Sequence, residues 1–276
     1  MLSKFYVRDH VKSALMEDIG YGDITTENLA GENDFLKAEL NTRSEGVLCG
    51  CEVFKTVFDV LSDDVKIKFY FKDGDTIKKG DKIADIEGPA KDLLMGERVS
   101  LNYIQRMSGI ATETRKYQEA IAPYTAQIVD TRKTTPNFRA FEKYSVKIGG
   151  GALHRFNLSD CAMIKDNHIR LAGSLTNAVN KLRNNISHAH KIEVECDTLE
   201  QVKEAVNVKA DIIMLDNMPI ETMKKAVELI NHQAIVEASG NVNLSTVNTI
   251  ASTGVDIISS SAIVAKAPTL DLALDM

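Results

Sequence analysis

Two adjacent cations follow an apolar run in the segment Asp130–Pro136, which reads DTRKTTP. Arg132 offers a planar fork for a carboxylate, and Lys133 offers a compact positive charge. Neighbouring side chains at a strand end point in different directions, so the pair could hold two sides of one anionic ligand. Pro136 suits the first turn of a following helix, with a preceding threonine as its N-cap. A surface Arg-Lys pair beside a capped helix would show the same pattern.

Three consecutive glycines, Gly149–Gly151, stand shortly before His154 and Arg155. Glycine allows close backbone approach and exposes N–H groups, which suits an anion, and the two side chains would add donors. A flexible loop with an uninvolved histidine is the alternative.

Charged side chains also end three later apolar runs. Lys165 could contact a phosphate or a carboxylate, or form a Schiff base as in barrel aldolases. Glu193 and Glu195 are two apart on one predicted strand and therefore share a face. Together with Asp216 they could bind ribose hydroxyls or Mg2+, which prefers oxygen ligands. Burial of acids is costly without a partner, which favours a functional interpretation.

The last two apolar runs end in small residues before short predicted helices. Such loops can expose helix N-terminal N–H groups to a phosphate, at a position where barrels often bind one. The candidate residues are Ser239, Gly240, Asn241, Ser260 and Ser261.

The charge distribution indicates a pocket for a small anion. The 276-residue chain has a net charge of −6, which argues against nucleic acid as a partner. Residues 131–170 nevertheless hold eight Lys and Arg against three Asp and Glu. No apolar run reaches the roughly 18 residues of a membrane span, and the first residues lack a signal-peptide core. We therefore expect a cytoplasmic protein with no membrane partner.

The elements that must position these residues alternate from about residue 126 onward. Six short apolar runs, AQIVDT, CAMIK, KIEVECD, DIIMLD, AIVEASG and VDIISSS, are mostly separated by helical patterns. This alternation predicts an α/β fold with a parallel sheet, either doubly wound or closed into a barrel. The absence of a GxGxxG turn favours the barrel. About 150 residues are few for eight repeats, so an irregular, partial barrel is expected. The preceding part mixes helical segments with strand-like ones.

Taken in order, these segments resemble the quinolinate phosphoribosyltransferase family, the type II phosphoribosyltransferases. The resemblance runs nearly end to end, and it rests on these motifs: ALMEDIGYGDITT, ERVSLNYIQRMSGIAT, DTRKTTP, FEKYSVKIGGG, HRFNLSDCAMIKDNH, IEVE, IIMLDN, EASGNV and TGVDIISSS. It implies an N-terminal α/β sandwich over residues 1–112, rejoined by residues 266–276, and a partial α/β barrel over residues 113–265. It also implies a homodimer, or a higher oligomer, with a shared active site.

The resemblance further implies an activity and roles for single residues. The enzyme would transfer phosphoribosyl from phosphoribosyl pyrophosphate to quinolinate with decarboxylation, using Mg2+, in NAD biosynthesis. Arg98 of the ERVSLN motif would enter the partner's site. Glu195 and Asp216 would hold the ribose hydroxyls and Mg2+, and the two small-residue loops would take the 5′-phosphate. The quinolinate and pyrophosphate pocket would be lined by Arg132, Lys133, His154, Arg155 and Lys165. The catalytic group would comprise Lys133, Lys165, Glu195 and Asp216.

Three positions depart from the family pattern. Asn137 stands where glycine is usual, Leu153 where asparagine often precedes His-Arg, and Ser259–Ser261 where Val-Gly-Ala is more common. Three other functions stay open from the sequence: a sister branch linked to molybdenum transport, a barrel aldolase, and a non-catalytic anion-binding protein.

Overall fold

The computed structural model describes residues 2–276, which form two compact units. The first comprises the residues up to Arg115 together with Pro136–Gly150 and Ala267–Met276. The second comprises Lys116–Thr135 and Gly151–Lys266. The segment Pro136–Gly150, expected within the barrel, thus groups with the first unit.

An antiparallel sheet in the order β12-β1-β5-β3 organises the first unit. Its strands are β1 (Phe35–Thr42), β3 (Lys66–Phe69), β5 (Lys82–Pro89) and β12 (Leu272–Asp275), beside a short pair, β2 (Gly46–Val47) and β4 (Thr76–Ile77). Its helices are α1 (Lys4–Ile19), α2 (Ile24–Leu29), α3 (Cys51–Leu61), α4 (Ala90–Ala120) and α5 (Arg139–Ile148), of which α4 runs into the second unit. Burial alternates along β1, so Leu40 enters the core while Glu39 faces outward. Phe54 of α3 and Ile104 of α4 cover that inner face.

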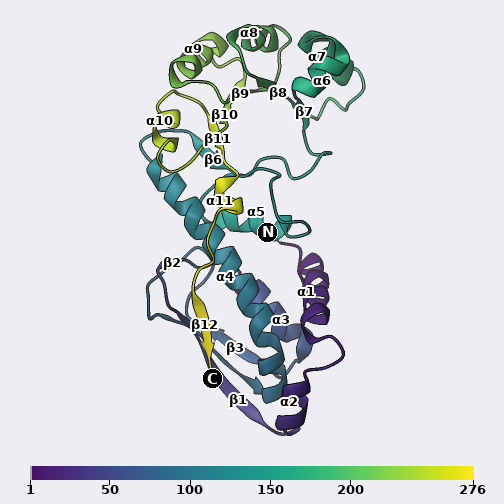
Figure 1. Ribbon diagram of the computed structural model, residues 1–276, viewed down its shortest axis with the longest axis vertical. Helices are drawn as coiled ribbons and strands as arrows, with labels where there is room; N and C mark the ends of the chain where they lie inside the picture. Colours follow the sequence, from purple (N-terminus) through teal and green to yellow (C-terminus); the bar gives the residue numbers. More distant parts are fainter. Residues whose placement is uncertain (1) are drawn as a thin grey trace. The chain divides into compact units, whose positions relative to one another are not determined.

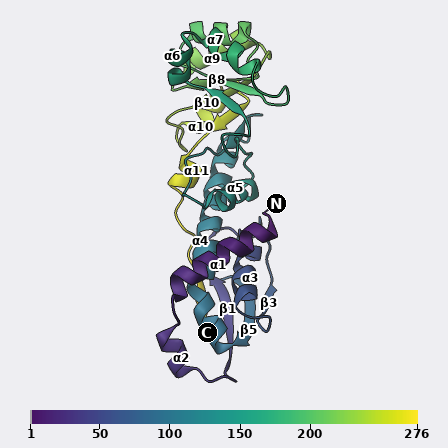
Figure 2. The ribbon, with the colours of Figure 1, turned by 90° about the vertical axis from the view of Figure 1, so that its right-hand side faces the viewer.

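A second cluster explains why α5 belongs to the first unit. Phe141 of α5 is fully buried against Val7 and Val11 of α1 and Tyr103 of α4. Figures 1 and 2 show α1 lying alongside α3, which supplies further residues to this cluster.

The start of α5 corrects the prediction for Pro136. The helix begins at Arg139 with Phe138 as N-cap, so Pro136 and its threonines lie outside it. Asn137 has a φ of +60°, a left-handed conformation that interrupts a helix after the proline. The same conformation explains the departure at this position, because asparagine tolerates it better than most side chains and glycine better still.

The glycine run is explained by packing. A Cβ atom on Gly149 would lie 2.5 Å from the carbonyl oxygen of Ala111 and 2.7 Å from Cβ of Thr114. Glycine here lets the end of α5 approach α4 closely. The anion-binding role expected for these glycines is wrong, because none of the three lines the cavity described below.

A six-stranded parallel sheet in the order β6-β11-β10-β9-β8-β7 organises the second unit. Its strands are β6 (Gln127–Val129), β7 (Ala162–Ile164), β8 (Ile192–Cys196), β9 (Ile212–Asp216), β10 (Ile235–Ser239) and β11 (Ile257–Ser259). Its helices are α6 (Asp166–Ala172), α7 (Leu175–Arg183), α8 (Leu199–Asn207), α9 (Ile220–Ile230), α10 (Val247–Ala251) and α11 (Ala262–Ala265). Figure 1 shows α7, α8 and α9 in a row beyond the strands. All six apolar runs became strands, and an α/β fold with a partial barrel is confirmed.

None of the helices formed by residues 2–276 is long and apolar enough to cross a membrane.

Candidate active site

A cavity of about 660 Å³ opens at the carboxyl ends of the parallel strands. Such edges carry the active sites of barrels because the loops after the strands converge there. The predicted residues that line this cavity are Arg132, Lys133, His154, Arg155, Lys165, Glu195, Asp216, Ser239, Gly240, Asn241, Ser260 and Ser261. Tertiary structure thus brings together side chains that are spread over about half of the sequence.

Arg98 is the one predicted site residue placed elsewhere. It is exposed on α4 in the first unit and is not among the described residues that line the cavity. The role of Arg98 across a subunit interface stays a prediction.

An ion pair crosses the cavity between two neighbouring strands. Lys165 follows β7 as the N-cap of α6, and its Nζ contacts Oε2 of Glu195 on β8. The lysine side chain is 43% exposed and the glutamate 17%, so the cation remains open to an incoming ligand. An anion in the cavity would compete with Glu195 for Lys165, which would release the carboxylate for other contacts.

The loop after β10 is held in shape by asparagines and a glycine. Gly240 and Asn241 both have positive φ, and Asn241 Nδ2 donates to Oδ1 of Asn217 at 3.0 Å. Asn217 Nδ2 in turn donates to Oδ2 of Asp216 at 2.8 Å. A Cβ atom on Gly240 would lie only 2.2 Å from Asn217 Oδ1. The loop therefore depends on glycine at this position, and it is coupled to the acid at the end of β9.

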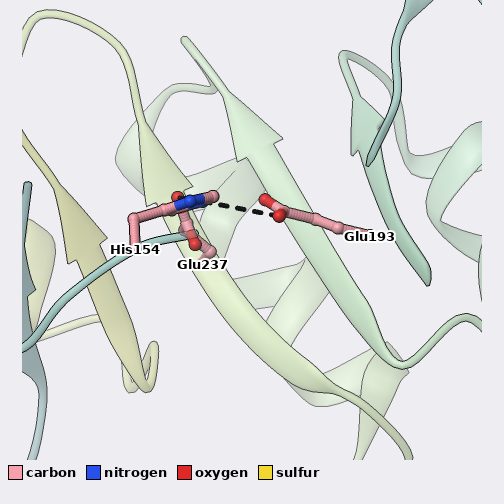
Figure 3. Close-up of side chains that lie close together, drawn as sticks. All are labelled: His154, Glu193 and Glu237. Carbon is pink, nitrogen blue, oxygen red and sulfur yellow. Dashed lines mark ion pairs between the residues drawn. The ribbon is translucent and has the colours of Figure 1, made fainter. Parts of the chain in front are cut away.

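Beneath the cavity, two glutamates from different strands meet one histidine, as Figure 3 shows. His154 Nε2 lies 3.4 Å from Oε2 of Glu193 on β8 and 3.4 Å from Oε1 of Glu237 on β10. Both glutamates are buried, at 0% and 1% exposure. We call these three residues the interior layer. Glu193 was expected to act beside Glu195 and Asp216, and this was wrong: it shares their face of the sheet but lies one step deeper.

The protonation of the interior layer follows from its burial and its charges. Burial lowers the pKa of His154, but hydrogen bonding and charge from Glu193 and Glu237 outweigh it and raise the pKa to about 10. Burial raises the pKa of Glu193, and the charge of Glu237 acts in the same direction. Nδ1 of the ring accepts a hydrogen bond from the backbone N–H of Arg155 at 2.7 Å, and this contact disfavours a second proton on Nδ1. Because Nδ1 needs its lone pair for this hydrogen bond, the ring holds its one proton on Nε2 in spite of the raised pKa.

The sequence analysis missed several cavity residues, among them Glu237, Asn217 and Lys266. Glu237 stands within the apolar run AIVEASG, where the same signal that singled out Glu193 was available. Asn217 follows β9 directly and orients Asp216. Lys266 carried no local signal, because it follows a short apolar helix rather than a strand.

Together, the parallel sheet, its cationic carboxyl edge, its paired acids and its small-residue loops define a phosphate-binding enzyme of the α/β-barrel class. The sequence model of the family described as "Quinolinate phosphoribosyl transferase, C-terminal domain" matches residues 110–275, and the model of the corresponding N-terminal domain matches residues 23–108. The chain belongs to the quinolinate phosphoribosyltransferase family, which confirms the resemblance seen in its motifs.

Similar proteins cover nearly the whole chain. A probable nicotinate-nucleotide pyrophosphorylase (carboxylating) of Synechocystis is 44% identical over 265 residues, covering 95% of this chain and 90% of the relative. A quinolinate phosphoribosyltransferase (decarboxylating) of Nicotiana tabacum is 38% identical, covering 97% and 81%. The crystal structure of NadC from Streptococcus pyogenes is 39% identical, with a TM-score of 0.97 and coverage of 100% and 98%.

Proposed function

We propose that this enzyme transfers the phosphoribosyl group of phosphoribosyl pyrophosphate to quinolinate and releases CO2, giving nicotinate mononucleotide and pyrophosphate for NAD biosynthesis. The names of the relatives describe this reaction in its two directions, as a carboxylating pyrophosphorylase and as a decarboxylating transferase. They favour it over the molybdenum-linked, aldolase and non-catalytic alternatives. The observation that carries the proposal is the single cavity that combines clustered cations with a Glu195–Asp216 edge and two small-residue loops.

The charges in the cavity match those of the two substrates. Quinolinate carries two adjacent carboxylates, and phosphoribosyl pyrophosphate carries a phosphate and a pyrophosphate. Arg132 and Arg155 suit the carboxylates because each guanidinium can donate two parallel hydrogen bonds. Lys133 and Lys165 suit the pyrophosphate as compact charges, and the loops at Ser239–Asn241 and Ser259–Ser261 suit the 5′-phosphate.

These placements account for each bond that changes. Pyrophosphate leaves the anomeric carbon with the electron pair of the broken C–O bond, and lysine charge stabilises it. The pyridine nitrogen supplies the pair for the new C–N bond and becomes positively charged. The electron pair released when the 2-carboxylate leaves as CO2 stays on that ring carbon, where the adjacent positive charge stabilises it until the carbon takes a proton. Glu195 and Asp216 would hold the ribose hydroxyls, so that the anomeric carbon stays aligned with the nitrogen.

We also propose that Mg2+ joins the reaction, because the donor chemistry fits. Glu195 and Asp216 stand at the carboxyl ends of neighbouring strands and line the same cavity. One or two carboxylates, completed by substrate phosphates, are a usual protein environment for Mg2+. When bound, Mg2+ would neutralise charge on the departing pyrophosphate. Chelation by EDTA should abolish turnover and added Mg2+ should restore it; undiminished activity in EDTA would remove the metal from the proposal.

The decisive assay follows nicotinate mononucleotide and CO2 from purified protein with quinolinate, phosphoribosyl pyrophosphate and Mg2+. Nicotinate serves as the matched control substrate, since it lacks only the 2-carboxylate. We expect product from quinolinate and none from nicotinate. Product from nicotinate alone would keep the transfer and overturn the decarboxylation, and no product from either would overturn the function.

We propose a homodimer in which Arg98 completes the partner's cavity. Arg98 is exposed on α4 and is not among the described residues that line the cavity of its own chain, which supports this role. Arg98→Ala and Lys133→Ala should each be inactive. Mixing them should restore about a quarter of wild-type activity, because half of the dimers are mixed and each of these holds one intact site. No recovery after proven subunit exchange would contradict a shared site. The cytoplasmic location stays a prediction.

A further inference from the structure

The interior layer lies between two cavities of the second unit. Above it is the proposed substrate cavity, which His154 and Glu237 line. Below it is a second cavity of about 370 Å³, which His154, Glu193 and Glu237 also line. The lower cavity reaches Ile212 and Ile257, the first residues of β9 and β11, so it lies toward the amino ends of the strands. The layer therefore forms the floor of the substrate cavity.

Both ring nitrogens of His154 are engaged within the protein. Nε2 faces the two glutamates at 3.4 Å each, and Nδ1 accepts the backbone N–H of Arg155 at 2.7 Å. The backbone N–H of His154 donates to Oδ1 of buried Asp130 at 2.9 Å. The ring is therefore held in place by protein groups at both of its nitrogens.

The contact at Nδ1 connects the layer to a cation of the substrate cavity. Arg155 has its backbone N–H on His154, and its guanidinium donates to the carbonyl of Cys161 at 2.8 Å. A second guanidinium nitrogen lies 3.5 Å from the sulfur of Met163. Arg155 is thus held at its backbone by His154 and at its guanidinium by Cys161 and Met163.

We infer that Glu193 and Glu237 are positioning residues that clamp His154 from two strands and, through it, set the place of Arg155 at the substrate carboxylate. This inference deepens the proposed function and rests on it. The two acids come from β8 and β10, with β9 between them, so they hold the ring from either side of one strand. A packed apolar pair would fill this interior without the cost of burying charge, so the acids call for a role beyond packing.

If the two glutamates position Arg155, their substitution should weaken binding of quinolinate and leave binding of phosphoribosyl pyrophosphate nearly unchanged. Glu193→Gln and Glu237→Gln keep the side-chain size but remove the charge that faces Nε2. Each should raise the KM for quinolinate about 10-fold, because Arg155 would be less well placed for a carboxylate, while the KM for phosphoribosyl pyrophosphate changes less than about 2-fold. Equal changes in both constants, or a loss of thermal stability with unchanged constants, would overturn a positioning role.

Glu204→Gln is the matched control in the same unit. Glu204 lies on α8, is half-buried, and accepts from the backbone N–H and the hydroxyl of Thr176, away from both cavities. Its loss should lower thermal stability and leave both KM values as in wild type. An increase in the quinolinate KM for this variant would show that the assay reports loosened packing rather than position, and would overturn the inference.

A spectroscopic readout tests the clamp independently of turnover. In protein labelled with 15N at histidine, the ring of His154, assigned by comparison with His154→Asn, should show its proton on Nε2 and a bare Nδ1. Glu193→Gln and Glu237→Gln should shift those two nitrogens, while Glu204→Gln should not. Unshifted nitrogens would overturn the clamp even where KM changes. If wild type fails to convert quinolinate, the proposed function fails while this spectrum still tests the clamp.

Metal analysis tests whether the same three side chains bind a metal ion instead. The ligand atoms of His154, Glu193 and Glu237 lie within 4.8 Å of one another, a spacing that could hold a cation. We expect no metal retained in proportion to protein after dialysis against a chelator-free buffer. One equivalent of metal that disappears in Glu193→Gln would replace the clamp with a metal site.

Discussion

Charged side chains of β1 and β5 in the first unit face outward and pair at the surface, whereas those of β8 and β10 in the second unit lie inside the fold. Lys82 reaches Glu39 at 3.0 Å and Asp85 at 2.9 Å, with every partner at least 40% exposed. Glu193 and Glu237 have almost no exposure. The difference follows from sheet type, because a sheet covered on one face leaves the other to water, and a parallel sheet inside a barrel leaves neither.

This contrast teaches where a charge is informative. On the outer face of the first sheet a charge needs no purpose beyond solvation, since exposed ion pairs add little stability. In the parallel sheet every charge must be paired or used. The charges there fall into two levels, the cavity edge and the interior layer, and both bear on the proposed reaction.

Removing a charge at the cavity edge should have the largest effect. Lys165→Ala should lower kcat/KM about 1,000-fold, because it removes a cation from the leaving pyrophosphate and leaves Glu195 without its partner. Steady-state kinetics checks this. Lys191→Ala, an exposed lysine just before β8 at the opposite end of the strands, is the control and should keep wild-type kinetics. A loss of less than about 10-fold for Lys165→Ala would place the reaction elsewhere.

A core residue of the first sheet should affect stability but not chemistry. Leu40 is fully buried on the inner face of β1, so Leu40→Ala should cost about 3 kcal/mol in free energy of unfolding through lost contacts and a cavity. Denaturant unfolding measures this cost. At temperatures where the variant is folded, its KM for both substrates should match wild type. A selective rise in one KM would show that the first sheet shapes a substrate site.

Gly240 and Gly254 both have positive φ, so substituting each of them distinguishes the effect of backbone strain from the effect of a changed loop shape at the cavity. Gly240→Ala and Gly254→Ala both place a Cβ at positive φ, and each should cost about 1–2 kcal/mol. Only at position 240 does the Cβ meet Asn217, at 2.2 Å; at 254 the nearest atom is 3.5 Å away. Gly240→Ala should therefore raise the KM for phosphoribosyl pyrophosphate about 10-fold, and Gly254→Ala should leave it unchanged. Equal KM values would remove this loop from phosphate binding.

The smallest effect is expected on the outer face of the first sheet. Lys82→Ala removes ion pairs with Glu39 and Asp85, all of them solvent-exposed. Kinetic constants should be unchanged, and the thermal midpoint should move little, because water and salt screen such pairs. A marked drop in the midpoint would contradict the contrast between the two sheets.

Local features of the sequence predicted much of the fold and most of the cavity. The six apolar runs became the six parallel strands, and the charged residues at their ends, such as Lys165 and Asp216, came together at one edge. Local signals failed where a distant segment decided the outcome. The run Gly149–Gly151 looked like an anion loop, but its first glycine is needed for contact with α4.

Sequence by itself determined the family, the α/β class and the set of cations and acids available, because strand periodicity and strand-end chemistry are local properties of the chain. Tertiary structure decided how deep in the barrel each charged side chain lies. Glu193 and Glu195 share a face of one strand, yet only Glu195 lines the substrate cavity, while Glu193 meets His154 and Glu237 from elsewhere in the chain. Periodicity shows which way a side chain points, whereas its partner depends on which strands lie across the barrel, and only the folded chain fixes that.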